Sequence, residues 1–92
     1  MNEVKHIAGR PMYSVDDVVV FKLYTGNDVC VMDGTIEIVD RFGAWGIDNP
    51  REPSYDIMVD DWMGRGKPMF VKHIRESSIV EVKGKRPLVD RY

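Results

Sequence analysis

The sequence predicts an all-β domain, either a small barrel or a sandwich, built from five short strands. Three observations support this prediction. Apolar and polar residues alternate with period two in several segments, glycine-bearing turns separate those segments, and no segment has the 3.6-residue period of an amphipathic helix. The 92 residues correspond to one domain with one modest core.

The clearest strand signal lies at residues 52–59. Pro53 fixes its own φ angle and donates no hydrogen bond, so it marks the place where strand pairing begins. From Tyr55 onward apolar and polar side chains alternate, which is typical of a half-buried strand. The segment lies in the middle of the chain between two other strand signals, which indicates a central strand of the sheet. Ile57 is therefore expected to face the interior, and Met58 the solvent. The core expected around Ile57 contains Phe21, Ile36, Ile38 and Val80.

The elements before this strand follow from composition and period. Residues 1–11 have no sustained period and are interpreted as a flexible arm. Residues 18–23 form the first strand, and a turn at residues 25–28 leads into a long second strand over residues 29–40. Within that strand the apolar residues change from odd to even positions around Gly34, which predicts a bulge or a sharp bend there.

The elements after the second strand are a loop and three short strands. Residues 41–52 form the longest stretch without period, and a structureless loop of this length in a small domain favours a functional role. The third strand, at residues 52–59, is followed by a glycine-rich return. Strands at residues 69–73 and 79–82 complete the set, and residues 85–92 form a charged tail.

Two short patterns resemble a known fold. Residues 72–80, Lys-His-Ile-Arg-Glu-Ser-Ser-Ile-Val, resemble the strand, 3₁₀ turn and closing strand of an SH3-like barrel. Residues 15–19, Val-Asp-Asp-Val-Val, followed later by Gly-Thr-Ile at residues 34–36, are similar to the opening of KOW and Tudor-type barrels. The resemblance implies a five-stranded SH3-like barrel over residues 12–84, with a short 3₁₀ turn before the last strand.

A more specific resemblance covers residues 34–40, 52–59 and 72–77. These segments are similar to a group of short uncharacterised proteins from Gram-positive bacteria and their phages. That group brings no activity with it. SH3-like barrels as a class bind proline-rich peptides, methylated lysine, nucleic acid or ribosomal partners, so the fold alone does not choose the partner.

Charge is unevenly distributed along the chain, although the net charge is only −2. Residues 16–62 contain eleven acids and three bases, whereas residues 63–92 contain eight bases and three acids. If strands from the two halves alternate in the sheet, the acidic and basic side chains lie close together in space. If the two halves stay apart, the basic residues form a positively charged surface. A cytoplasmic protein is expected, because the single Cys30 excludes an internal disulfide and no segment is long and apolar enough to span a membrane.

A non-enzymatic domain that binds a protein partner is the leading functional hypothesis. The loop at residues 41–52 contains both glycines and aromatic residues, and long loops of this kind tend to carry contact residues. The neighbouring face of the third strand is expected to contribute to the same surface. The residues expected to contact the partner are Phe42, Trp45, Asp48, Asn49, Glu52, Tyr55 and His73.

Two other classes of ligand stay open. A small nucleotide-like molecule could be bound by an oligomer such as a homodimer, with the pocket between two copies. The basic residues of the C-terminal third could instead bind nucleic acid. No catalytic or metal site and no cofactor are predicted, because His73 has no paired nucleophile and the carboxylates, histidines and cysteine lack a recognised ligand spacing. His6, in the arm, is expected to be solvated.

Overall fold

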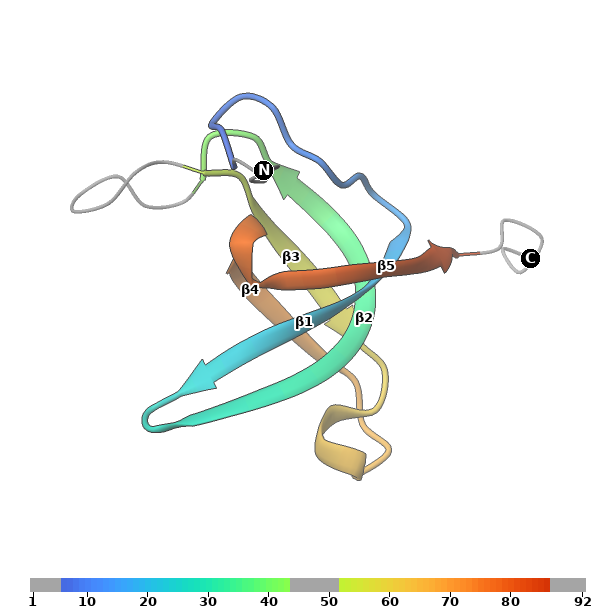
Figure 1. Ribbon diagram of the computed structural model, residues 1–92. Helices are drawn as coiled ribbons and strands as arrows, with labels where there is room; N and C mark the ends of the chain where they lie inside the picture. Colours follow the sequence, from blue (N-terminus) through green and yellow to red (C-terminus); the bar gives the residue numbers. More distant parts are fainter. Residues whose placement is uncertain (1–5, 44–51, 87–92) are drawn as a thin grey trace.

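Five antiparallel strands form one sheet in the computed structural model, which describes residues 6–43 and 52–86 (Figure 1). The strands are β1 (Asp17–Thr25), β2 (Asp28–Asp40), β3 (Ser54–Val59), β4 (Met69–Arg75) and β5 (Ile79–Lys85). The one-turn 3₁₀ helix η1 (Trp62–Gly64) precedes β4, and a second one, η2 (Glu76–Ser78), precedes β5. The predicted all-β class and its five strands are confirmed.

The sheet is open rather than closed into the expected barrel. Hydrogen-bonded pairing gives the order β4-β3-β2-β1-β5, so β4 and β5 are its two edges. Within the described residues no ladder joins these edges, because η2 turns the chain after β4 and β5 then pairs with β1. Figure 1 shows the long β2 curving strongly along its length and β5 lying across β1.

The hairpin between β1 and β2 forms at the predicted turn. Thr25 pairs with Asp28, which leaves Gly26 and Asn27 as a two-residue turn. Gly26 has a φ angle of 62°, a left-handed conformation that glycine adopts without steric cost. Tyr24, next to this turn, is 60% exposed, so the hairpin projects beyond the core.

The inward face of β3 also agrees with the prediction. Tyr55 and Ile57 are fully buried and Val59 is buried, whereas Asp56 and Met58 are only partly covered. Both edges of β3 are hydrogen-bonded, since β2 pairs with it on one side and β4 on the other. β3 is therefore an interior strand, as its central position in the chain indicated.

The sequence predicts Ile38 in the core, but half of its surface is exposed, and the cause is a bulge in β2. Ile36 pairs with Ile57. Ile38 already pairs with the adjacent residue of β3, Asp56, so β2 contains one extra residue at this point. A single extra residue reverses which side chains face inward, and Ile38 consequently points to solvent.

Val80 is likewise predicted to lie in the core but is 53% exposed, again because of a bulge. Phe21 pairs with Ile79, whereas Val20 pairs with Glu81, so Val80 is the extra residue of β5. Buried Ile79 takes the inward position that strict alternation gives to Val80. Both corrections have the same origin. The alternation of apolar and polar residues predicts which side chains face inward only as far as the next bulge in the strand pairing.

Gly34 is a point of close contact between strands, and the bulge of β2 lies beyond it. Ile36 belongs to the core and Met32 packs against it, and each lies two residues from Gly34. The alternation of inward and outward side chains therefore continues through Gly34. A Cβ atom at Gly34 would lie only 2.6 Å from the carbonyl oxygen of Met58 and 2.6 Å from Cγ2 of Ile57. β2 passes at this point from its pairing with β1 to its pairing with β3.

One hydrophobic core lies on the inner face of the curved sheet. Its buried members are Val19, Phe21, Ile36, Tyr55, Ile57, Val59, Val71, Ile74 and Ile79. All five strands contribute at least one of these side chains, so the core links the two edges of the sheet although no ladder does. Among the described residues, neither 3₁₀ turn nor any other helix has the length and apolar character needed to cross a membrane.

Candidate functional site

A cleft of about 500 Å³ opens between the end of β1 and the η2 turn, and we call it the β1–η2 cleft. It is lined by residues 22–24 of β1, residues 73–75 of β4, and Ser77 and Ser78 of η2. Leu23 and Ile74 supply apolar surface to it, and the other lining residues carry charged, hydroxyl or aromatic groups. Segments about fifty residues apart in sequence thus form one concave surface.

Alternation along β1 places two side chains at this cleft. Phe21 faces the core, whereas Lys22 and Tyr24 on the opposite face are exposed. Lys22 and Tyr24 pair across the hairpin with Val31 and Val29, both of which are exposed apolar residues of β2. The cleft therefore begins at the outer face of a projecting hairpin.

A bulge in β4 turns His73 toward the cleft. Tyr55 of β3 pairs with Ile74 and Ile57 pairs with Val71, so two residues of β4 stand opposite the single Asp56. His73 takes a φ angle of 62°, which is unfavourable for a residue with a Cβ atom. Its backbone N–H donates a hydrogen bond of 2.9 Å to Oδ1 of Asp56, and this bond holds the strained conformation.

Glu52 fixes η2 at the other side of the cleft. The backbone N–H and the hydroxyl of Ser77 donate hydrogen bonds of 2.8 Å and 3.1 Å to the two carboxylate oxygens of Glu52. The next residue, Pro53, accepts a backbone hydrogen bond of 2.9 Å from Glu76. The start of β3 therefore determines where Ser77 and Ser78 lie.

Lys22 and Arg75 bring two positive charges to the cleft. Both side chains are exposed, and within residues 6–43 and 52–86 neither makes an ion pair. Among the described residues, no carboxylate lines the cleft: Glu52, which accepts bonds from Ser77, and Asp56, which accepts one from the backbone of His73, both lie outside its lining. The cleft is therefore positively charged.

The basic residues of β5 and its C-terminal end are in a different situation. Lys83 lies 2.7 Å from Asp33, and Lys85 lies 2.9 Å from Asp17. Hydrogen bonding to Asp33 raises the pKa of Lys83 above its ordinary value. Arg86 reaches two carboxylates, Glu37 at 2.8 Å and Asp16. In this part of the described structure the acidic and basic halves of the sequence neutralise each other.

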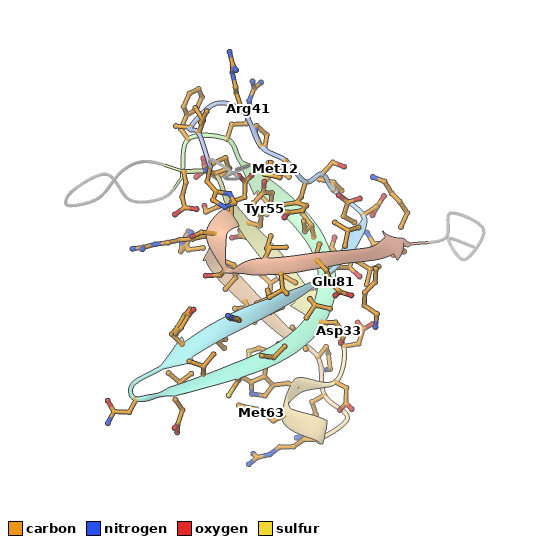
Figure 2. All side chains as sticks on the ribbon, viewed as in Figure 1. Met12, Asp33, Arg41, Tyr55, Met63 and Glu81 are labelled. Atoms are coloured by element: carbon orange, nitrogen blue, oxygen red, sulfur yellow. The ribbon has the colours of Figure 1, made fainter. Side chains whose placement is uncertain are left out.

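A buried carboxylate lies behind the cleft, at the base of η2. The side chain of Glu76 is fully buried. Its Oε2 accepts hydrogen bonds of 2.6 Å from the Tyr55 hydroxyl and 2.8 Å from the backbone N–H of Met12. Its Oε1 lies 2.7 Å from Nδ1 of His6. Figure 2 shows Met12 and Tyr55 close together at the end of the sheet where this network forms.

The two tyrosines of this network resist ionisation. Burial raises the pKa of Tyr55 far above its ordinary value, and the hydrogen bond to Glu76 raises it further. Burial and the nearby charge of Glu76 also raise the pKa of Tyr13, whose ring meets that of Tyr55 edge-on at 5.7 Å. His6, expected to be solvated, is instead only 23% exposed because it packs against Glu76.

The predicted partner-binding residues are divided between the surface, the interior and the segment outside the described residues. Trp45, Asp48 and Asn49 belong to that last group. Phe42 is 59% exposed, and its ring lies beside Gly9 of the N-terminal segment. The hypothesis of a contact surface on the loop at residues 41–52 stays a prediction.

The other three predicted residues are not brought together on one surface. Glu52 and His73 both belong to the region of the β1–η2 cleft, through Ser77 and through the lining itself. Tyr55 is fully buried and its hydroxyl is bonded to Glu76, so it presents no surface to a partner. Tyr55 is buried because its side chain lies on the same face of β3 as that of Ile57, two residues away, and this face points inward.

Several residues of the site were not selected from the sequence. Lys22, Tyr24 and Arg75 line the cleft, and their outward positions follow from alternation on β1 and β4. That pattern was available, but nothing in it shows that the ends of these two strands lie next to each other. Burial of Glu76 likewise depends on residues far away in the chain, and the sequence carries no local signal for it.

A second, smaller cleft of about 160 Å³ lies beside β2 and the end of β3. Asp33, Asp60 and Asp61 are among the residues that line it. Two of these carboxylates are already engaged, Asp33 with Lys83 and Asp61 with the backbone N–H of Gly66. Among the described residues, no three histidine, cysteine or carboxylate side chains converge in a way that could hold a metal ion.

Comparisons of the chain with protein-family models, with curated proteins and with solved structures found no match.

Proposed function

We propose that this chain is a non-enzymatic binding domain of SH3-like architecture, and that its site is the β1–η2 cleft. The architecture is supported by the strand order, by the curved β2 that pairs with β1 along one part and β3 along the other, and by the η2 turn before β5. Fold alone does not determine a ligand, so the functional part rests on the cleft.

The single observation that carries this proposal is the lining of the cleft. Apolar surface from Leu23 and Ile74 is combined there with cationic, hydroxyl and aromatic groups within about 500 Å³. Pockets that hold small ligands combine apolar surface with a few placed polar groups and have volumes of roughly 300–1,000 Å³, and this cleft has such a volume with a more polar lining. The strained backbone of His73 is a second support, because unfavourable conformations are retained preferentially at functional sites.

Binding is a better account of the cleft than catalysis. Its basic lining residues, Lys22, His73 and Arg75, are all exposed. Catalytic acids and bases generally lie where water is excluded, because burial and neighbouring charges adjust their protonation. The exposed groups of this cleft are suited to contact and orient a ligand.

Titration of the ¹⁵N-labelled chain with a small-molecule fragment library tests the proposal. We expect the backbone amide signals that shift to cluster at residues 22–24 and 73–78. Shifts that are scattered over the surface, or that cluster elsewhere, would remove the cleft as the binding site.

A matched pair of variants separates the cleft from general surface stickiness. Tyr24 lines the cleft and is 60% exposed, whereas Phe42 lies outside its lining and is 59% exposed. Tyr24→Ala should weaken the binding of fragments that shift the cleft signals, and Phe42→Ala should leave it unchanged. Equal loss in both variants would show non-specific contact with exposed aromatic rings.

A further inference from the structure

The β1–η2 cleft carries two cations that have no ion-pair partner among the described residues, whereas the cations of β5 and its C-terminal end are paired. Lys83, Lys85 and Arg86 all lie within ion-pair distance of carboxylates. Lys22 and Arg75, which face the same cleft, have no such partner among the described residues. The site therefore selects for a ligand with negative charge, because each cation can gain an anionic partner there without losing one.

Tyr24 gives the same cleft a planar apolar surface. Tyr24 lines the cleft, is 60% exposed, and is held on a two-stranded hairpin opposite Val29. An exposed aromatic ring beside cationic side chains is the arrangement on which nucleic-acid bases stack. The Tyr24 ring therefore favours a ligand that carries a planar aromatic group in addition to its negative charge.

The extent of the charged surface limits the size of the ligand. A volume of about 500 Å³ matches one ligand of nucleotide size. Binding of an extended nucleic-acid strand requires a continuous track of free cations along the surface. The basic residues that could continue such a track on β5, Lys83 and Lys85, are held by Asp33 and Asp17.

We infer that the β1–η2 cleft binds a mononucleotide-sized ligand, with Lys22 and Arg75 contacting its phosphate and Tyr24 stacking on its base. The hydroxyls of Ser77 and Ser78 lie at the same cleft as further polar contacts. This inference rests on the proposed function, because it names the ligand class of the same site.

Titrations of the ¹⁵N-labelled chain with adenosine monophosphate, adenosine, inorganic phosphate and an eight-nucleotide single strand test it. We expect adenosine monophosphate to bind at least about tenfold more tightly than adenosine or inorganic phosphate, since each lacks one of the two recognised groups. Binding of the monophosphate should weaken as salt concentration rises. The oligonucleotide should bind no more tightly than the monophosphate.

Charge variants assign the phosphate contact to named residues. Lys22→Gln and Arg75→Gln should each weaken binding of the monophosphate about tenfold and leave adenosine binding unchanged. Tyr24→Ala should weaken both ligands about fivefold or more. Lys67→Gln removes an exposed cation outside the cleft lining and is the control, which should bind like the unmodified chain.

The outcomes distinguish this inference from the proposed function. If adenosine and its monophosphate shift the cleft signals with equal affinity, the cleft still binds ligands but the charge-based inference is overturned. A stronger response to the oligonucleotide than to the monophosphate would assign the cleft to nucleic acid and overturn the inference also. If neither these ligands nor the fragment library shifts the cleft signals, both proposals fail.

Discussion

Glu76 joins three parts of the chain that are distant in sequence. Its buried carboxylate accepts hydrogen bonds from Tyr55 in β3 and Met12 before β1, and it lies against His6. An unpaired buried carboxylate would cost several kcal/mol, and the hydrogen bonds offset that cost. Residues 6–12 are consequently held against the sheet by a side chain from η2.

Replacement of Glu76 should therefore be among the most damaging single changes in this protein. Glu76→Ala leaves the Tyr55 hydroxyl and the Met12 N–H without their acceptor, and we expect a loss of about 3–5 kcal/mol in the free energy of unfolding. Glu76→Gln retains one carbonyl oxygen for those two donors and should lose much less. Urea unfolding of both variants measures the difference, and equal losses would contradict the proposed role of the hydrogen bonds.

Tyr55 makes the stability of the domain sensitive to alkaline pH. Because its pKa is raised in the folded state, the neutral phenol is favoured by folding, and the contribution to stability is fully present below about pH 10. Above that pH only the unfolded chain releases the proton. The free energy of unfolding should therefore fall by up to about 1.4 kcal/mol per pH unit.

The variant Tyr55→Phe isolates this contribution. At neutral pH it should lower stability by about 1–3 kcal/mol, because Glu76 loses a donor. Between about pH 10 and 11.5 its unfolding free energy should decline less steeply than that of the unmodified chain, although the raised pKa of Tyr13 leaves some slope. Urea unfolding at each pH measures the free energy of unfolding of both proteins. If it declines equally steeply with pH in the two proteins, the pH dependence does not come from Tyr55.

At the scale of strands, alternation in the sequence predicted most of the sheet. The inward side chains of β3 and the two-residue turn at Gly26 and Asn27 were found where expected. The predicted inward orientation was wrong for Ile38, which follows the bulge of β2, and for Val80, which is the extra residue in the bulge of β5. A bulge depends on how two strands meet, and a single strand's sequence does not contain that information.

Gly34 tests how tightly β2 approaches β3. A methyl group there would lie 2.6 Å from the carbonyl oxygen of Met58, which belongs to a paired backbone and cannot rotate away. We expect Gly34→Ala to lower the free energy of unfolding by about 1–3 kcal/mol, measured by urea unfolding. Gly26→Asn is the control: no atom lies within 4 Å of an added Cβ, and asparagine tolerates its left-handed conformation, so little change is expected. A neutral Gly34→Ala would show that the strands can separate.

For the whole molecule, the sequence predicted the class but not the closure of the sheet or the position of the site. Strand number and strand faces are local properties, and these were mostly predictable. The open edges and the β1–η2 cleft arise from which strands pair, with β1 between β2 and β5, and no local pattern specifies that order. The charged halves of the sequence were expected to meet in space or to separate, and ion pairs such as Lys83 with Asp33 show them meeting.

The single core sets the overall stability, and Ile57 is one of its fully buried residues. Its side chain is fully buried, so Ile57→Ala should cost about 2–4 kcal/mol by leaving a cavity. Domains of this size have total stabilities near the low end of about 5–15 kcal/mol, so the variant retains little reserve. Met58→Ala, on the half-buried opposite face, should cost under about 1 kcal/mol. Urea unfolding of the pair would contradict the assignment of faces if Met58→Ala were the more damaging.

The position of β1 between β2 and β5 has a consequence for how the chain acquires its structure. The hydrogen bonds from His6 to Glu76 and from Arg86 to Asp16 each join residues 70 positions apart. During synthesis, β1 can pair with β2 early, but its second neighbour does not exist until the last strand has been made. Such distant pairings are associated with slow folding, in milliseconds to seconds. The segment that precedes β1 is therefore expected to find its place only after η2 and β5 have been synthesised.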